Sequence, residues 1–212
     1  SLYLFIFIHL LAVRSGVAAL YITSLLFLIR ALWNPRFKWR AFILLIVVTI
    51  TPIIAYLALP SFQNRIHYMV RDFSHYQTQK WDAYSDAERI LSIRTGLDIA
   101  AEHPLLGVGA DLKSEMKRRF NEEYDKYSFI MPHNQFVSIL AAHGILGLFL
   151  FIIAILAPIW PGRYWGNNYF IALHGIVFSS FLVENTIETS VGVAIYLFFL
   201  LIGLNHMKIS PS

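Results

Sequence analysis

Long apolar runs separated by short polar links make up most of this 212-residue chain. Ala41–Leu59 and Val137–Trp160 are each close to the roughly 20 residues that a helix needs to cross a bilayer. The shorter apolar runs are Leu2–Val13, Val17–Ile29, Tyr169–Val183 and Val191–Leu204. This pattern predicts an all-α, polytopic helical membrane protein with transmembrane helices in residues 1–59 and 137–212. Pro52 lies inside the first long run and predicts a kink or a local break there.

One long polar stretch, residues 60–136, interrupts the apolar runs, and we expect it to form a separate loop domain. The segment Ser85–Glu88 has the spacing of a capping box and predicts a helix that starts near Ala87. His103-Pro104 should end this helix, and a second helix is expected over Asp111–Arg119. Four apolar positions share one face of the first helix at helical spacing: Ile90, Ile93, Leu97 and Ala101.

The distribution of charge predicts a topology. Residues 60–136 hold eleven of the thirteen acidic residues and ten of the seventeen basic ones, so this stretch is nearly neutral. Six other basic residues lie in links that contain no acidic residue: Arg30, Arg36, Lys38, Arg40, Arg163 and Lys208. By the positive-inside rule these links are cytoplasmic, and the polar stretch lies on the opposite side of the membrane. The net charge of +4 is therefore read as a topology signal, and no nucleic-acid partner is expected.

The composition excludes several kinds of site. The chain has no cysteine, so disulfides, thiolate metal sites and a cysteine nucleophile are ruled out within it. Gly107-Val108-Gly109 lacks the lysine and hydroxyl residue of a phosphate-binding loop, which argues against nucleotide binding. Acidic residues of the polar stretch show no metal-ligand spacing, and we expect no cofactor and no metal. Because the chain starts with serine and its first apolar run is short, we expect further spans before it.

Four residues are candidates for chemistry, and each also has a structural explanation. His133 lies where the polar stretch re-enters the membrane, and a partly desolvated imidazole there could act as a base or cap a helix. Arg14 lies among apolar residues, where an arginine either faces a cavity or a charged ligand or extends to the interface. Arg89 and Arg94 could bind phosphate, although an ion pair also explains Arg89. They lie roughly 140° apart around a helix, so both cannot face one site directly.

Other polar residues have simpler interpretations. The basic cluster Lys117–Arg119 is expected to be a solvated face or a contact with lipid headgroups. Glu184 and Glu188 flank a short turn between two apolar runs, and they could end helices or line the same cleft as the candidates. Three histidines lie within apolar runs and should pack or form hydrogen bonds between helices: His9, His143 and His174.

Several motifs in a fixed order resemble the O-antigen ligase/polymerase (Wzy-like) superfamily. They are Arg14-Ser15-Gly16, Arg89, Pro104–Gly109 (PLLGVG), Pro132–Phe136 (PHNQF) and Gly144–Gly147 (GILG). The family often has tryptophan four residues after the loop arginine, whereas this chain has Ile93 there. Arg94 follows directly and could share or take over the role of the family's loop arginine.

The resemblance implies a polytopic enzyme of the bacterial inner membrane with a large, mostly helical periplasmic loop, here residues 60–136. Members move a glycan from undecaprenyl pyrophosphate to an acceptor without a nucleotide sugar or a catalytic metal. Carried over, Arg14 and Arg89, or Arg94, would bind the donor pyrophosphate, and His133 would position or deprotonate the acceptor hydroxyl. The family has more spans than this chain, which therefore resembles its C-terminal half.

The first interpretation is an O-antigen ligase that uses lipid A-core as its acceptor, with membrane lipids around its spans. A polymerase, whose acceptor is a second lipid-linked repeat, and a protein O-oligosaccharyltransferase remain open because they share these motifs. A non-catalytic transport subunit would carry polar residues along several spans, and the spans here are largely apolar. A non-catalytic assembly subunit would use the surface of the loop and would not depend on His133.

Overall fold

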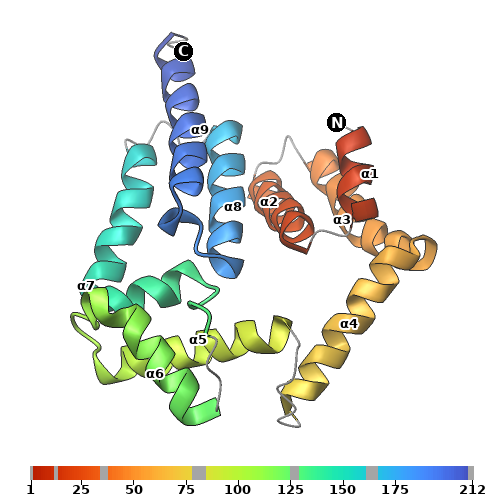
Figure 1. Ribbon diagram of the computed structural model, residues 1–212. Helices are drawn as coiled ribbons and strands as arrows, with labels where there is room; N and C mark the ends of the chain where they lie inside the picture. Colours follow the sequence, from red (N-terminus) through yellow and green to blue (C-terminus); the bar gives the residue numbers. More distant parts are fainter. Residues whose placement is uncertain are drawn as a thin grey trace. The chain divides into compact units, whose positions relative to one another are not determined.

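The computed structural model describes residues 2–11, 14–33, 38–77, 85–124, 129–160 and 167–209 (Figure 1). These ranges contain nine α-helices joined by turns and short 3₁₀ segments, and they contain no β-strand. The all-α prediction is therefore confirmed. The long apolar sequences form helices because a helix pairs its backbone groups internally, which a lipid environment requires.

The helices form two compact units. The first unit comprises residues 1–71 and 168–179. Its elements are α1 (Leu2–Leu11), α2 (Arg14–Trp33), α3 (Lys38–Ala58), most of α4 (Pro60–Gln77) and most of α8 (Asn168–Val183). The second unit comprises residues 72–167 and 180–212. Its elements are α5 (Ser85–Glu102), α6 (Leu112–Tyr124), α7 (Gln135–Leu156), α9 (Ser190–Ile209) and the end of α8.

Three helical stretches of the described ranges are long and apolar enough to cross a membrane: Ser15–Trp33, Ala41–Ala58 and Gln135–Ile159. The helices α8 and α9 are apolar but shorter. This composition agrees with the predicted polytopic membrane protein. The helix α3 continues past Pro52, so the predicted break does not occur.

In the second unit, α5 and α6 pack against the first half of α7 around a small hydrophobic core. The fully buried side chains of this core include Leu91, Ile99, Met116 and Phe120. The helix α5 starts at Ser85 and ends at Glu102, close to the predicted bounds. The predicted polar stretch is therefore mostly helical wherever it is described.

The face of α5 that packs is not the one that the apolar spacing predicts. Leu97 of the predicted face is 45% exposed, whereas Ser92 and Thr95 on the opposite side are buried. The reason is close packing at Gly96, where an added Cβ would lie 2.8 Å from side-chain atoms of Pro132 and Val137. Small residues therefore share this face with the buried Leu91 and Ile99, and a pattern that counts only large apolar side chains misses them.

The helix α7 is interrupted at Gly144, where φ is 64° and ψ is −168°. Figure 1 shows the two halves of α7 running in different directions. The turn Pro104–Gly107 fills the interruption: Ile145 N donates to Pro104 O (2.8 Å), and Leu146 N donates to Leu105 O (3.4 Å). Val108 N in turn donates to Ala141 O (3.0 Å). The PLLGVG and GILG motifs therefore bind each other backbone to backbone, and the predicted single span bends at this point.

Two glycines are required for this contact. The backbone angles of Gly144 lie in a region that only glycine populates readily. A Cβ on Gly144 would lie 2.2 Å from the carbonyl carbon of Leu105, and one on Gly107 would lie 2.3 Å from that of Ala142. Both distances are far below van der Waals contact, so neither position has room for a side chain.

We predict that Gly144→Ala and Gly107→Ala lower the thermal unfolding midpoint much more than Gly109→Ala. Gly109 also has a positive φ, of 65°, but nothing lies within 4 Å of its added Cβ. Its substitution should therefore cost only the conformational term, about 1–2 kcal/mol. The measurement is thermal unfolding of the three purified variants in the same detergent. Equal losses in all three would contradict the close backbone contact.

Candidate functional site

The PHNQF motif fixes the start of α7 to the turn that joins α8 and α9, residues 184–189. Asn134 is the N-cap of α7, since its side-chain oxygen accepts from the backbone N–H groups of Phe136 and Val137. Its amide also donates to the carbonyl of Leu182 (3.2 Å). The buried Gln135 accepts from Ile187 N (2.9 Å). Residues of one motif therefore hold one turn in place.

His133 and Arg89 meet on this turn. His133 Nδ1 lies 3.1 Å from Oε2 of Glu184, and Arg89 Nη2 donates to Oε1 of the same carboxylate (3.2 Å). The backbone N–H of His133 also donates to Ser92 Oγ (3.3 Å), which itself donates to the carbonyl of Arg89 (2.7 Å). Two candidates from different segments of the sequence are therefore joined by both side-chain and backbone contacts.

The contact with Glu184 sets the orientation of the imidazole. An ionised carboxylate only accepts hydrogen bonds, so Nδ1 of His133 carries the hydrogen, and the lone pair of a neutral ring lies on Nε2. The His133 side chain is 26% exposed, and those of Arg89 and Glu184 are 41% and 45% exposed. A ligand can therefore reach all three groups. Chemically, the arrangement offers a base, a guanidinium and the carboxylate that holds both.

The other two predicted arginines are placed differently. Arg94 is exposed on α5, five positions after Arg89. Arg14 is the first residue of α2 in the other compact unit, and its side chain lies outside the described part of the structure. The structure thus brings Arg89 and His133 together and adds Glu184. The sequence signal for Glu184 was its position at a polar turn between two apolar runs.

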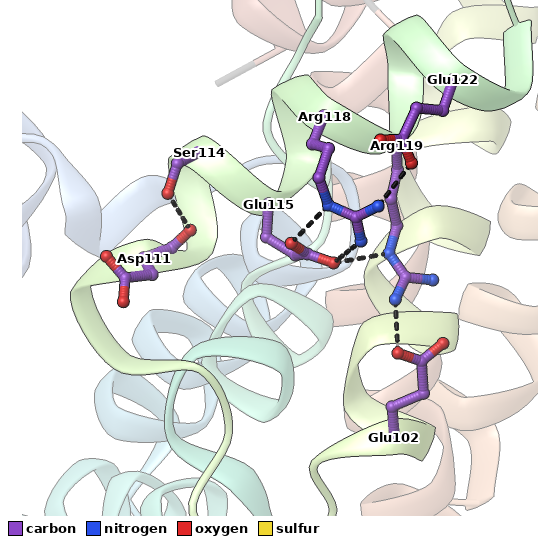
Figure 2. Close-up of polar contacts among 7 residues, drawn as sticks. All are labelled: Glu102, Asp111, Ser114, Glu115, Arg118, Arg119 and Glu122. Carbon is purple, nitrogen blue, oxygen red and sulfur yellow. Dashed lines mark hydrogen bonds and ion pairs between the residues drawn. The ribbon is translucent and has the colours of Figure 1, made fainter.

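The basic cluster of α6 is largely engaged in ion pairs within the loop (Figure 2). Arg119 is only 8% exposed and pairs with Glu102 and Glu115. Arg118 donates to Glu115 (Nε to Oε2, 3.0 Å) and also to Glu122. The prediction of a solvated or lipid-binding face is therefore wrong for Arg119, which ties α6 to the end of α5. Lys117 is exposed, in agreement with the prediction of a solvated face at this position.

These ion pairs change the acidity of Glu115. Hydrogen bonds from Arg118 and then Arg119 lower the pKa of its carboxyl from 4.5 to about 2, against the opposing effect of burial. The same pairing with Glu102 raises the pKa of Arg119 further above its ordinary value. The cluster therefore stabilises the packing of α6 against the end of α5. It is separate in sequence from the PHNQF motif.

A cavity of about 340 Å³ lies beside the same turn of the second unit. Its polar lining includes Lys113, Ser138, His143 and Glu188, and the hydroxyl of Ser138 donates to Glu188. His143 is exposed there and does not pack as predicted. In the first unit, by contrast, His9 joins two helices as predicted, because its Nε2 lies 2.9 Å from the hydroxyl of Tyr21. Within the described ranges, no group of three or more His, Asp or Glu residues could hold a metal ion.

The model of the O-antigen ligase family matches residues 1–152, which is more than two thirds of the chain. This span contains Arg14, Arg89, His133 and both glycine motifs. Among curated proteins no significant match is found.

We predict that Glu115→Gln destabilises the protein above about pH 4.5 and flattens the dependence of its stability on pH between about 4.5 and 2. A carboxyl whose pKa is lowered on folding stabilises the fold above its unfolded pKa, and this stabilisation is lost as the pH falls through the folded value. Thermal midpoints in detergent across this interval provide the measurement. Glu122→Gln is the control, because Glu122 pairs with Arg118 where both side chains are at least half exposed. A Glu115→Gln curve parallel to that of the unsubstituted protein would refute the account.

Proposed function

Because the chain belongs to the O-antigen ligase family, we propose that it transfers a glycan from undecaprenyl pyrophosphate to an acceptor hydroxyl at the periplasmic face of the bacterial inner membrane. The family is one of glycosyltransferases that use lipid-linked glycan donors. The observation that carries the proposal is the contact of Glu184 with both His133 and Arg89. This contact supports the proposal because an imidazole and a guanidinium lie next to each other and are both partly exposed.

In the proposed reaction, the acceptor oxygen attacks the anomeric carbon of the first donor sugar. The bond from that carbon to the pyrophosphate oxygen breaks, and undecaprenyl pyrophosphate leaves with the bonding electrons. His133 takes the proton of the acceptor hydroxyl on Nε2, and Glu184 stabilises the resulting imidazolium through Nδ1. Pyrophosphate is already a good leaving group, so positioning and charge neutralisation are the main tasks of the protein.

Arg89 is assigned to the pyrophosphate. A guanidinium binds phosphate oxygens in the same geometry in which it binds a carboxylate, and Arg89 already holds Glu184. The pyrophosphate would therefore approach Arg89 beside Glu184, within reach of the His133 ring. The resemblance also implies a pyrophosphate-binding role for Arg14. Arg94 is the alternative to Arg89, and the contact of Arg89 with Glu184 beside His133 makes Arg89 the first choice.

As the acceptor we propose lipid A-core, which the resemblance to O-antigen ligases implies. A polymerase or a protein O-oligosaccharyltransferase would use the same donor chemistry with another hydroxyl as nucleophile. The loop at residues 60–136 is accordingly placed in the periplasm, where the lipid-linked donor and lipid A-core meet. This placement follows the positive-inside distribution of the basic links.

We predict that the full-length gene carrying His133→Ala fails to restore glycan-capped lipopolysaccharide in a ligase-deficient strain. Loss of the general base should lower the transfer rate by about 10²–10⁴-fold. The readouts are capped lipopolysaccharide on a gel and the amount of lipid-linked donor that accumulates. His206→Ala is the matched control, because His206 is exposed on α9 and lies far along the chain from the PHNQF motif.

Each result has a distinct meaning. Loss of capping with full-length glycan still on the lipid carrier supports a ligase that depends on His133. Caps of a single repeat in the variant point to a polymerase instead. Normal ladders at normal protein levels would remove His133 from the mechanism.

A further inference from the structure

We propose that the turn Pro104–Gly107 enters the edge of the hydrocarbon core of the bilayer, where Leu105 and Leu106 contact lipid acyl chains. The turn lies in the polar stretch of the sequence, so its composition alone does not place it in a membrane. The inference is independent of the catalytic roles proposed above. It concerns how the loop is seated on the membrane.

The length of the second half of α7 provides the first argument. The candidate span Gln135–Ile159 bends at Gly144, which leaves residues 145–159 as its straight part. At 1.5 Å per residue this part is about 22 Å long. The hydrocarbon core is about 30 Å thick, so this half by itself is about 8 Å too short to cross it. Its first residues, Ile145 and Leu146, therefore lie at or within the edge of the core.

The hydrogen bonds at the bend provide the second argument. In an uninterrupted helix, Ile145 N would donate to Ala141 O. Here each of these two groups has a hydrogen-bond partner in the segment Pro104–Val108 instead. Ile145 N donates to Pro104 O, and Val108 N donates to Ala141 O. Such replacement is what a broken helix needs in hydrocarbon, where no water can satisfy the freed groups. It also holds the turn at the level of Ile145 and Leu146.

Exposure of apolar side chains provides the third argument. Leu105 and Leu106 are 64% and 72% exposed, although both sit on a backbone that is tightly held. Ile145 and Leu146, to which the turn is bonded, are 55% and 53% exposed. The same apolar surface continues along the span through further exposed side chains: Phe149, Leu150 and Ile153. The leucines of the turn thus extend a surface that already belongs to a candidate span.

Polar side chains close to the bend lie at the cavity and not on the surface formed by the leucines. His143 directly precedes Gly144, and it lines the cavity together with Lys113 of α6. These polar side chains fit the headgroup level, next to a turn that reaches the acyl chains. We therefore assign membrane lipids as the molecules that contact Leu105 and Leu106. A covering segment of protein, or water, is the competing outcome.

The absence of cysteine in this chain makes site-directed spin labelling direct. Single cysteines would replace Leu105 or Leu106 in the full chain, reconstituted in phosphatidylethanolamine and phosphatidylglycerol vesicles and labelled with a nitroxide. Collision with oxygen, which concentrates in hydrocarbon, is compared with collision with a water-soluble nickel chelate. Phe149→Cys is the control for lipid, and Lys117→Cys is the control for water, since both side chains are exposed.

We expect the ratio of oxygen to nickel collisions at both leucine positions to exceed that at Lys117→Cys several-fold and to approach that at Phe149→Cys. Both leucines are exposed, so cysteine removes little packing and the variants should keep the thermal midpoint of the parent chain. A ratio equal to that at Lys117→Cys would place the turn in water and overturn the proposal. Low collision rates with both reagents would show that protein covers the leucines, which would also overturn it.

Discussion

A helix that crosses a membrane must pair its backbone groups within the protein, and α7 meets this requirement through an exchange at Gly144. The turn that follows α5 supplies carbonyl groups to Ile145 and Leu146, and it takes the carbonyl of Ala141 in return. Because backbone atoms make these hydrogen bonds, they fix the position of the end of α5 relative to α7. At Gly107 and Gly144 the two backbones lie so close together that a side chain at either position would not fit.

This fixed crossing positions the candidate site. Arg89 lies near the start of α5, and His133 lies directly before the N-cap of α7, so the packing of the two helices sets the distance between them. Gly96 and Ser92 allow the close approach, and Ser92 additionally bonds the backbone of both candidates. Glu184 then joins their side chains from the turn between α8 and α9. The carboxylate balances the guanidinium, orients the imidazole and leaves both exposed to a ligand.

The sequence predicted the features that depend on composition and on short-range signals. Apolar runs predicted the helices and the candidate spans, and the capping-box segment predicted the start of α5 within two residues. It did not predict the packing face of α5, because half of that face is made by Ser92, Thr95 and Gly96, which lie beside the buried Leu91 and Ile99 and carry no apolar signal of their own. The bend of α7 was also missed, since a glycine in a long apolar run is compatible with a straight helix.

For the candidate site, the sequence supplied residues but not their pairing. His133 and Arg89 were both named, yet 44 positions separate them and no local pattern links them. Glu184 was one of two acidic residues at its turn, and only the fold distinguishes it from Glu188, which instead accepts from Ser138. The burial of Arg119 was missed for a similar reason, because its partner Glu102 lies on another helix.

We propose that Glu184 acts through His133 and Arg89 at one site. A double-mutant cycle with the purified full-length protein tests it most directly, by comparing transfer rates of His133→Ala, Glu184→Gln and the double variant. If Glu184 orients His133, its substitution should lower kcat by about tenfold or more, and the double variant should lose clearly less than the product of the two single losses. Losses that multiply would show that the two residues act independently, and they would contradict the account.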